Sequence, residues 1–407
     1  MTTFLQLSLL LSIILLSAKL AGYLSVRLGQ PSVLGELLVG ILLGPSVIDV
    51  LNMPFIDHAL TDTIAELGEL GVLLLMFLAG LELHLNELTR NTRVAAYAGS
   101  LGVLVPAILG WGAGRLFGMD NATAIFLGLS LGATSVSISA QTLMELKVLR
   151  SRVGLSLLGA AVFDDILVIL SLSIFLAIES GTGSLGGIVW ILVRMIAFLS
   201  LSVAFGLWVL PWLMRRIAHL PISQGVLTLA LVVMLAYGLV AELLGGMAAI
   251  TGAFIAGLMM ARSGEKERVE HGVHALAYGL FVPVFFINIG LSVNARSLQA
   301  GMFWFTLVIT LVAIIGKWLG SGIGARLGGL NRRESIQLGA GMVSRGEVGL
   351  IVASVGINEG LISLDEFSAV IGMVLVTTVV TPPILRSLFA EKEQKSVEVD
   401  QANEEVS

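Results

Sequence analysis

The sequence predicts an all-α polytopic membrane protein with about thirteen transmembrane helices. Three observations predict this class: 56% of the 407 residues are hydrophobic, only 13% are charged, and the mean hydropathy is +0.97. Soluble globular chains carry about 25% charged residues, so we exclude a soluble protein. At roughly 30 residues for each crossing and its connection, the helices fill the chain and leave no room for a large extramembrane domain.

Apolar runs bounded by charged residues, Gly and Pro mark the expected helices. In chain order they cover about residues 4–25, 32–48, 64–84, 94–117, 122–145, 152–177, 186–213, 223–244, 247–262, 272–293, 301–326, 335–358 and 366–389. The first run has no positively charged start and no small-residue cleavage site, so we expect a retained helix. We expect residues 1–389 to form one transmembrane domain, and the polar, acidic residues 390–407 to form a short disordered cytoplasmic tail.

The charges between these runs support the boundaries and predict an orientation. If the N-terminus is outside, the cytoplasmic connections hold Arg27, Arg90, Arg93, Lys147, Arg150, Arg152, Arg215, Arg216, Arg262, Lys266, Arg268, Arg326, Arg332 and Arg333, and the tail holds Arg386, Lys392 and Lys395. The external connections then hold Arg115 and Arg296 beside the acidic residues Asp49, Asp57, Asp62, Asp120, Glu179, Glu359, Asp365 and Glu366. Because cytoplasmic loops are enriched in Lys and Arg, we expect the N-terminus outside and the C-terminus in the cytoplasm.

A weak internal repeat relates the two halves of the chain. Residues 34–42 resemble residues 251–259, and residues 129–135 resemble residues 338–344. An odd number of expected helices separates each matching pair, so the second copy enters the membrane from the opposite side. We therefore expect two inverted six-helix repeats, over about residues 4–177 and 223–389, around a linker helix over about residues 186–213. Inverted repeats are typical of transporters that work by alternating access.

Two adjacent carboxylates, Asp164 and Asp165, lie about 12 residues into the segment 152–177, which is roughly 18 Å deep and near the bilayer centre. Charged groups are costly there, and they usually mark an ion pathway or a proton relay. Lys317 lies at a similar depth in the segment 301–326. A pair between Lys317 and one aspartate would keep both charged, either as a structural ion pair or as a titrating partner, and the sequence leaves both open.

Two segments carry small and hydroxyl residues where a continuous helix would favour Leu or Ala. They are GATSVSISAQ, within 122–145, and GMVSRGEVGL, within 335–358. We expect both helices to be broken and to cross at the midplane, where their dipole ends and free carbonyls can coordinate a small ion. The residues expected to support this site are Thr134, Ser135, Ser344, Arg345 and Glu347. The candidate ligands of a monovalent cation are Asp165, Asp164 and Thr134.

Other charged residues favour less specific roles. Glu82, near the cytoplasmic end of the segment 64–84, is either a solvated helix end or part of a funnel that attracts cations. Four residues near helix ends are expected to snorkel to the interface: Lys19, Glu36, Arg194 and Glu242. The chain has no cysteine and no metal-ligand spacing, nucleophile elbow or phosphate loop, so we predict neither an enzyme nor a cofactor. The net charge of −5 predicts no nucleic-acid partner.

These features together resemble bacterial monovalent cation:proton antiporters of the second cation:proton antiporter family, close to the NapA type. The most specific matches are AVFDD at 161–165, Ala133-Thr134-Ser135, SRGEVGLI at 344–351, Gly316-Lys317 and GELLVGILLGP at 35–45. The resemblance implies an NhaA/NapA-like fold, a homodimer in the lipid bilayer, and a six-helix core that moves like an elevator. It also implies that Asp165 carries the cation or the proton, and that Asp164 pairs with Lys317.

The function that this resemblance implies is exchange of a monovalent cation, Na⁺ or Li⁺, for protons in the inner or another internal membrane of a bacterium. Family members with an Asp-Asp pair tend to be electrogenic. A K⁺/H⁺ antiporter of the Kef-like branch is an alternative, although that branch usually has a neutral residue at the first Asp and a cytosolic nucleotide-binding domain. A sodium-coupled organic-anion symporter, a cation channel and a membrane sensor are further alternatives. The symporter would not need a midplane Asp-Asp pair with a lysine, and a channel or a sensor would show currents or no flux instead of saturable exchange.

Overall fold

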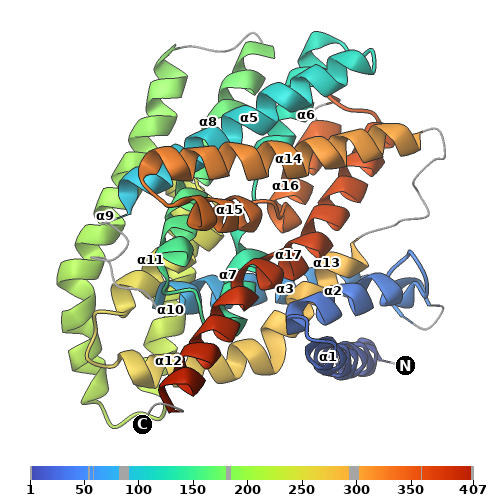
Figure 1. Cartoon of the computed structure of the whole chain (residues 1–407). Coiled ribbons are helices and arrows are strands. Elements are labelled where there is room, and N and C mark those ends of the chain that lie inside the picture. The colour runs from blue at the N-terminus through green and yellow to red at the C-terminus, as the bar shows by residue number, and fades with distance from the viewer. Residues whose placement is uncertain are drawn as a thin grey trace.

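The computed structural model describes residues 2–53, 56–57, 59–81, 91–179, 185–292, 302–358 and 360–404, and helices make up nearly all of them (Figure 1). No strand occurs among these residues. Ten helical segments within them are long and apolar enough to cross a membrane, and two shorter apolar helices accompany them. The predicted all-α membrane architecture is therefore confirmed.

The helices follow the expected segments in order. The first half contains α1 (Thr3–Arg27), α2 (Ser32–Leu43), the 3₁₀ turn η1 (Val50–Asn52), α3 (Ala59–Leu81), α5 (Thr92–Leu116), α6 (Asn121–Gly132), α7 (Val136–Glu145) and α8 (Arg152–Glu179). After α9 (Leu185–Ala218), the second half contains α10 (Gly225–Val240), η2 (Ala241–Gly245), α11 (Ala249–Met260), α12 (Lys266–Leu276), η3 (Ala277–Phe281), α13 (Val282–Leu291), α14 (Phe303–Gly328), α15 (Arg332–Gly341), α16 (Gly346–Asn358) and α17 (Leu364–Glu404).

Two boundaries differ most from the sequence expectation, and several others shift by up to five residues. The helix expected from residue 272 begins earlier, since α12 starts at Lys266. The last helix, α17, continues through Glu404 and so includes most of the segment for which we expected a disordered tail. Both extensions are polar, and apolar periodicity does not report helices of this kind. Their many Glu, Lys, Gln and Ala residues nevertheless have high intrinsic helix propensity.

The helices form two groups, each built from both halves of the chain. Helices α1–α3 pack with α10–α13 and with α9, whereas α5–α8 pack with α14–α17. In Figure 1, α14 lies across α5 and α15, and α9 runs along one edge of the molecule. The most extensive contacts between the two groups join α2 and α3 to α7, α2 to α17, and α8 to α9. We call the set α5–α8 with α14–α17 the site group and the other set the scaffold group.

Glycines allow close approach of α3 and α11 inside the scaffold group. A Cβ atom added at Gly80 would lie 2.1 Å from the carbonyl oxygen of Phe254, and one at Gly257 would lie 2.0 Å from that of Phe77. Membrane helices pack through small residues because lipid supplies no hydrophobic force between them. The two glycines therefore bring the backbones of α3 and α11 together.

Two π turns, η2 and η3, interrupt the hydrogen bonding of the scaffold helices, and basic side chains contact the carbonyl groups there. Arg194 donates from Nε to the carbonyl of Leu244 (2.7 Å) and from Nη2 to that of Leu243 (2.8 Å). Lys19 donates to the carbonyl of Tyr278 (2.8 Å). We expected Lys19 and Arg194 to snorkel, but both satisfy backbone groups at the turns, which have no water to bind in a bilayer. Glu36, which was also expected to snorkel, is buried in the structure.

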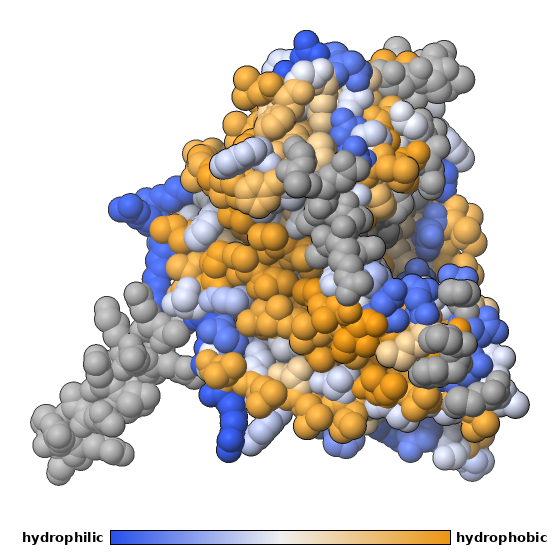
Figure 2. Space-filling model, turned by 90° about the vertical axis from the view of Figure 1, so that its right-hand side faces the viewer, coloured by the Kyte–Doolittle hydropathy of each residue, from blue (hydrophilic) through white to orange (hydrophobic). Residues whose placement is uncertain are grey.

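The surface of the molecule is strongly apolar. Large hydrophobic side chains are exposed on several helices, among them Leu116, Trp208 and Trp304. Figure 2 shows a broad patch of hydrophobic residues on one face, between hydrophilic residues at its top and along its lower part. Exposed apolar area of this extent is what a lipid bilayer covers.

Candidate functional site

Two interrupted helices meet inside the site group. The first gap, residues 133–135, separates α6 from α7, and the second, residues 342–345, separates α15 from α16. The backbone amide of Ser135 donates to the carbonyl oxygen of Ser344 (2.9 Å), so the two gaps are in direct contact. Both interruptions lie where the sequence predicts them.

The conformation of the second gap depends on a glycine. Gly346 has a φ of +41°, and a Cβ atom there would lie 2.5 Å from the hydroxyl of Ser135. Its amide donates to the hydroxyl of Thr378 on α17 (3.1 Å). A residue with a side chain would be strained in this backbone conformation and would push the two gaps apart.

Arg345 connects the second gap to the first. Its side chain is fully buried; Nη1 donates to the carbonyl of Ala133 (2.5 Å), and Nη2 donates to that of Ala313 on α14 (2.9 Å). Helix ends leave carbonyl groups without helical partners, and a guanidinium can satisfy two such groups at once. Arg345 thus holds the first gap against α14.

Lys317 and Asp164 form a buried ion pair beside the first gap. Both side chains have no exposed surface, and the lysine Nζ contacts the carboxylate Oδ1 of Asp164. The same Nζ donates to the carbonyl of Gly132, the last residue of α6 (2.6 Å). The other carboxylate oxygen of Asp164 is buried without a hydrogen-bond partner among the described residues. The charge of Asp164 is therefore balanced by Lys317.

Asp165 has different surroundings. It is 9% exposed, and the hydroxyl of Thr251 on α11 donates to its Oδ2 (3.1 Å). It lines a cavity of about 490 Å³ between the two helix groups. Ala133, in the first gap, lines the same cavity. Asp165 is thus the carboxylate of the pair that lines this cavity.

Further polar groups line the wall of this cavity. Glu69 on α3, Glu242 in η2, and Asn288 and Ser292 near the end of α13 face it with Asp165. Together with Asp165, the two glutamates place three carboxylates in a largely apolar cavity, and their negative potential favours cations. Sequence reasoning missed Glu69 and treated Glu242 as a snorkelling residue. The sequence did offer a signal for both, because each is an acidic residue inside an expected apolar segment, 64–84 or 223–244.

The remaining predicted residues have mixed outcomes. The hydroxyls of Thr134 and Ser344 are buried in the gaps and have no hydrogen-bond partner in the described part of the chain. Glu347 lies in α16, but its side chain is outside the described residues, and so is the whole of Glu82. Thr251 was not predicted as a site residue. It stood out only through the repeat match at 251–259, which is too weak to indicate a contact with Asp165.

The comparisons with known proteins agree with this geometry. A family model described as "Sodium/hydrogen exchanger, transmembrane" matches residues 13–391. The chain is 43% identical over 380 residues to the probable Na⁺/H⁺ antiporter GerT of Bacillus cereus. This alignment covers 93% of this chain and 98% of GerT. It is 41% identical over 384 residues to the Na⁺/H⁺-K⁺ antiporter GerN of the same organism, with 94% and 96% covered.

A solved structure shares the fold. The sodium proton antiporter MjNhaP1 of Methanocaldococcus jannaschii superposes with a TM-score of 0.68 at 18% sequence identity, over 96% of this chain and 98% of that one. At this identity, the likeness concerns the fold alone. The family match over most of the chain and the two full-length relatives above 40% identity decide the assignment: this chain belongs to the family of transmembrane sodium/hydrogen exchangers.

Proposed function

We propose that the protein exchanges a monovalent cation, Na⁺ in the first place and Li⁺ as a close analogue, for protons, and that Asp165 carries both. The observation that carries this proposal is the different environment of the two aspartates. Asp164 is fully buried and paired with Lys317, whereas Asp165 lines the cavity between the helix groups. A cation that enters the cavity meets the aspartate that lines it, while the other aspartate is held by the buried lysine.

Exchange follows from the cost of an isolated charge in a dry site. A bare carboxylate is expensive to move through the membrane, but the same carboxylate is tolerated when it is protonated or paired with a cation. Asp165 therefore crosses in one of these two forms. Because a proton and a cation compete for the same group, the movement of one load is coupled to the opposite movement of the other.

The Asp164–Lys317 pair is proposed to make the exchange electrogenic. If cation binding at Asp165 weakens the pair, Lys317 can release its proton in the dry interior, where a lone ammonium is unfavourable. Two protons would then exchange for one cation, and the cycle would move net charge. If the pair stays intact, one proton exchanges for one cation and the cycle is electrically silent.

The arrangement of the helices supports an elevator mechanism. The site group carries Asp164, Asp165, Lys317 and both helix gaps, and it contacts the scaffold group through few helix pairs. Each half of the chain supplies three expected crossings to each group, with α9 between the halves. This order fits thirteen crossings in inverted repeats, over about residues 4–177 and 223–389. Sliding of the site group would open Asp165 to alternate sides.

The expected orientation, with the N-terminus outside, predicts which side of the membrane the cavity faces. With the N-terminus outside, the cavity wall at Glu69, Glu242 and Ser292 would lie in the outer half of the membrane, and Asp165 would face the outside in this arrangement. We further propose a homodimer in the inner membrane of a bacterium, or in another internal bacterial membrane, in which the scaffold group forms the interface.

K⁺ is the second candidate cation. The relative GerN, 41% identical, is named as a Na⁺/H⁺-K⁺ antiporter. Its similarity along nearly the whole chain makes K⁺ exchange worth testing in parallel with Na⁺. The cavity is much larger than either Na⁺ or K⁺. Selection between the two ions would therefore depend on the groups that bind the ion at Asp165.

The test is proton flux in proteoliposomes that contain an internal pH dye, with Na⁺, Li⁺ or K⁺ added separately. We expect Na⁺ to drive proton movement in the wild type and Asp165→Asn to abolish it. The matched control is Asp62→Asn, which removes an exposed carboxylate in the first turn of α3 and should leave the flux unchanged. Equal flux in Asp165→Asn and the wild type would disprove the assignment of the carrying carboxylate.

Electrogenicity is tested in the same vesicles. A potassium-valinomycin clamp sets the membrane voltage during the Na⁺ and Li⁺ measurements. Exchange that accelerates or slows with voltage supports a net movement of charge. Exchange at the same rate under every clamp voltage would mean that one proton moves for one cation, and the proposed role of Lys317 as a proton carrier would be wrong.

A further inference from the structure

A hollow of about 340 Å³ lies between α14 and α15, away from the cavity at Asp165. It has an apolar wall and a basic rim. Its lining consists of Trp318, Leu319, Gly322, Ile323, Arg326, Arg332, Ser335 and Ile336. A second hollow of about 290 Å³ shares Arg332 and Ile336 with it and adds Arg333, Ser387 and Leu388.

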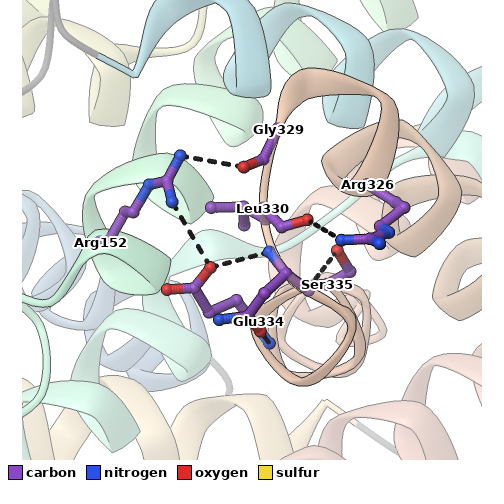
Figure 3. A network of polar contacts seen from close by, with 7 residues as sticks. Arg152, Arg326, Gly329, Leu330, Glu334 and Ser335 are labelled. Atoms are coloured by element: carbon purple, nitrogen blue, oxygen red, sulfur yellow. Dashed lines mark hydrogen bonds and ion pairs between the residues drawn. The ribbon is translucent and has the colours of Figure 1, made fainter.

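The basic rim has no acidic group among its described lining residues. Arg326 donates through Nη1 to the carbonyl of Leu330 (2.9 Å), which holds its guanidinium at the end of α14. The nearby carboxylate of Glu334 accepts from the amide of Asn331 (2.9 Å) and lies 3.7 Å from Arg152. Figure 3 shows Arg152 and Arg326 on opposite sides of the turn between α14 and α15. Glu334 is therefore engaged on the Arg152 side, and the positive charge of Arg326 and Arg332 remains for a ligand.

The apolar wall continues along a membrane-crossing helix. Leu319 and Ile323 are each 52% exposed, and Leu327, one turn further along α14, is 56% exposed. Trp318 closes the hollow by donating from its indole N–H to the carbonyl of Ile336 on α15 (3.0 Å). A stripe of exposed aliphatic side chains that ends in arginines matches a molecule with hydrocarbon chains and an anionic head.

We propose that this hollow binds an anionic phospholipid, with the phosphate at Arg326 and Arg332 and the acyl chains along Leu319 and Ile323. Arginine forks suit phosphate oxygens because several N–H groups point the same way. Basic pockets between helices at the membrane surface bind anionic head groups. The apolar stripe favours a lipid over a soluble anion, since a free phosphate would gain nothing from it.

The hollow lies beside two helices that carry parts of the ion site. Helix α14 carries Lys317, and α15 leads into the second gap. A lipid held at their connection would attach the site group, rather than the scaffold group, to one leaflet. This inference does not depend on the proposed exchange, because lipid binding is measured without any ion gradient.

Native mass spectrometry of the whole protein in detergent tests the proposal. Phosphatidylglycerol is titrated against the wild type, Arg326→Gln, Arg332→Gln and the double variant, with phosphatidylcholine as the neutral probe. We expect each substitution to weaken phosphatidylglycerol binding by about five-fold and to weaken phosphatidylcholine binding less, because the choline cation offsets the charge of its phosphate. The matched control is Arg262→Gln, an exposed arginine in the connection between α11 and α12, which should behave like the wild type.

Three results would overturn the proposal. They are equal phosphatidylglycerol binding in the double variant and the wild type, an equal loss in Arg262→Gln, and displacement of the lipid by millimolar inorganic phosphate, which would assign the arginines to a soluble anion. If the double variant does not fold, Arg332→Gln alone decides, because its exposed side chain is replaced without loss of packing.

Discussion

Asp164 and Asp165 are neighbours in sequence, but they lie in different environments because successive residues point about 100° apart around a helix. Asp164 faces Lys317 on α14, and Asp165 faces Thr251 on α11 and the cavity. One helix turn thus supplies a carboxylate paired with Lys317 inside the site group and a second carboxylate that lines the cavity at the boundary between the groups. This division is the basis of the roles proposed for the two residues.

The ion pair at Lys317 is expected to stabilise the fold. Lys317→Gln leaves the buried carboxylate of Asp164 without its partner, so we expect the free energy of unfolding to fall by about 3–5 kcal/mol. Thermal melting of the purified protein in detergent measures this loss. The double variant Lys317→Gln with Asp164→Asn removes both charges and should regain most of the stability. A double variant that melts as low as Lys317→Gln would show that the charge of Asp164 is not the cause.

Thr251 is expected to affect cation binding at Asp165. Thr251→Val removes the hydroxyl that donates to the carboxylate and keeps the shape of the side chain. The ionised form of Asp165, which alone binds the cation, then loses a hydrogen bond. We expect the apparent KM for Na⁺ to rise about ten-fold, since hydrogen bonds to charged groups contribute more than neutral ones. Thr251→Ser keeps the hydroxyl and should stay near the wild-type value; a similar rise in both variants would point to packing instead.

At the scale of the element, the interrupted helices need support from outside themselves. The two gaps leave carbonyl groups unpaired, and the structure satisfies several of them with Arg345, Lys317 and the amide of Ser135. The beginning of α6 is supported differently. Asp120 is its N-cap, and its side chain accepts from the amides of Ala122 (2.9 Å) and Thr123 (3.3 Å).

The cap at Asp120 predicts a pH dependence of stability. Hydrogen bonds from Thr123, first from its side chain and then from its backbone, lower the pKa of this carboxyl below its usual value of 3.8. A lowered pKa means that the cap stabilises the fold above pH 3.8 and that this contribution is lost as the pH falls through the lower, folded-state pKa. We expect Asp120→Ala to melt below the wild type at pH 7 and the two melting curves to converge under strongly acidic conditions. A constant difference at every pH would contradict this reason.

At the scale of the whole molecule, a contact of Glu145 at the end of α7 is one of several polar contacts that join the two helix groups. Glu145 of the site group accepts from the amide of Ser32 (2.7 Å), the hydroxyl of Ser32 (2.6 Å) and the side chain of Gln141 (2.8 Å). Ser32 begins α2 of the scaffold group, so the carboxylate also lies at the positive end of a helix dipole. An elevator movement must break this contact.

A cross-link across this contact tests the movement. The chain has no natural cysteine, so Ser32→Cys with Glu145→Cys introduces a unique pair for a short bifunctional, reducible thiol reagent. We expect cross-linking to stop cation–proton exchange in proteoliposomes and reduction to restore it. The physical reason is that the two groups can no longer slide.

The control places the same cross-link inside the site group. Arg152 on α8 and Glu334 on α15 lie 3.7 Å apart, and both belong to the group that should move as one body (Figure 3). Arg152→Cys with Glu334→Cys should cross-link without loss of exchange. Inhibition in both pairs, or in neither, would contradict a rigid movement of one group against the other.

Sequence alone determined the features that follow from placing each segment in lipid: the membrane helices, their interruptions and the unusual charged residues. Long apolar runs predict membrane helices because lipid leaves the backbone no partner except its own helix. The two interruptions were predictable as well, since small and hydroxyl residues replace helix formers there, and so was the special status of Asp164, Asp165 and Lys317, because charges deep in apolar segments are costly. The polar start of α12 and the extension of α17 escaped prediction because they lack an apolar period.

Only the tertiary structure decided which of these groups meet. The family resemblance implied the pair between Lys317 and Asp164, but residue spacing did not. This contact, the bond from Arg345 to the carbonyl of Ala133 and the bond from Thr251 to Asp165 join residues 86 to 212 positions apart. Depth along a helix is encoded locally, but the rotation of each helix about its axis is set by packing against its neighbours. For this reason the sequence could predict how deep each charge lies, and the fold had to decide which charge it faces.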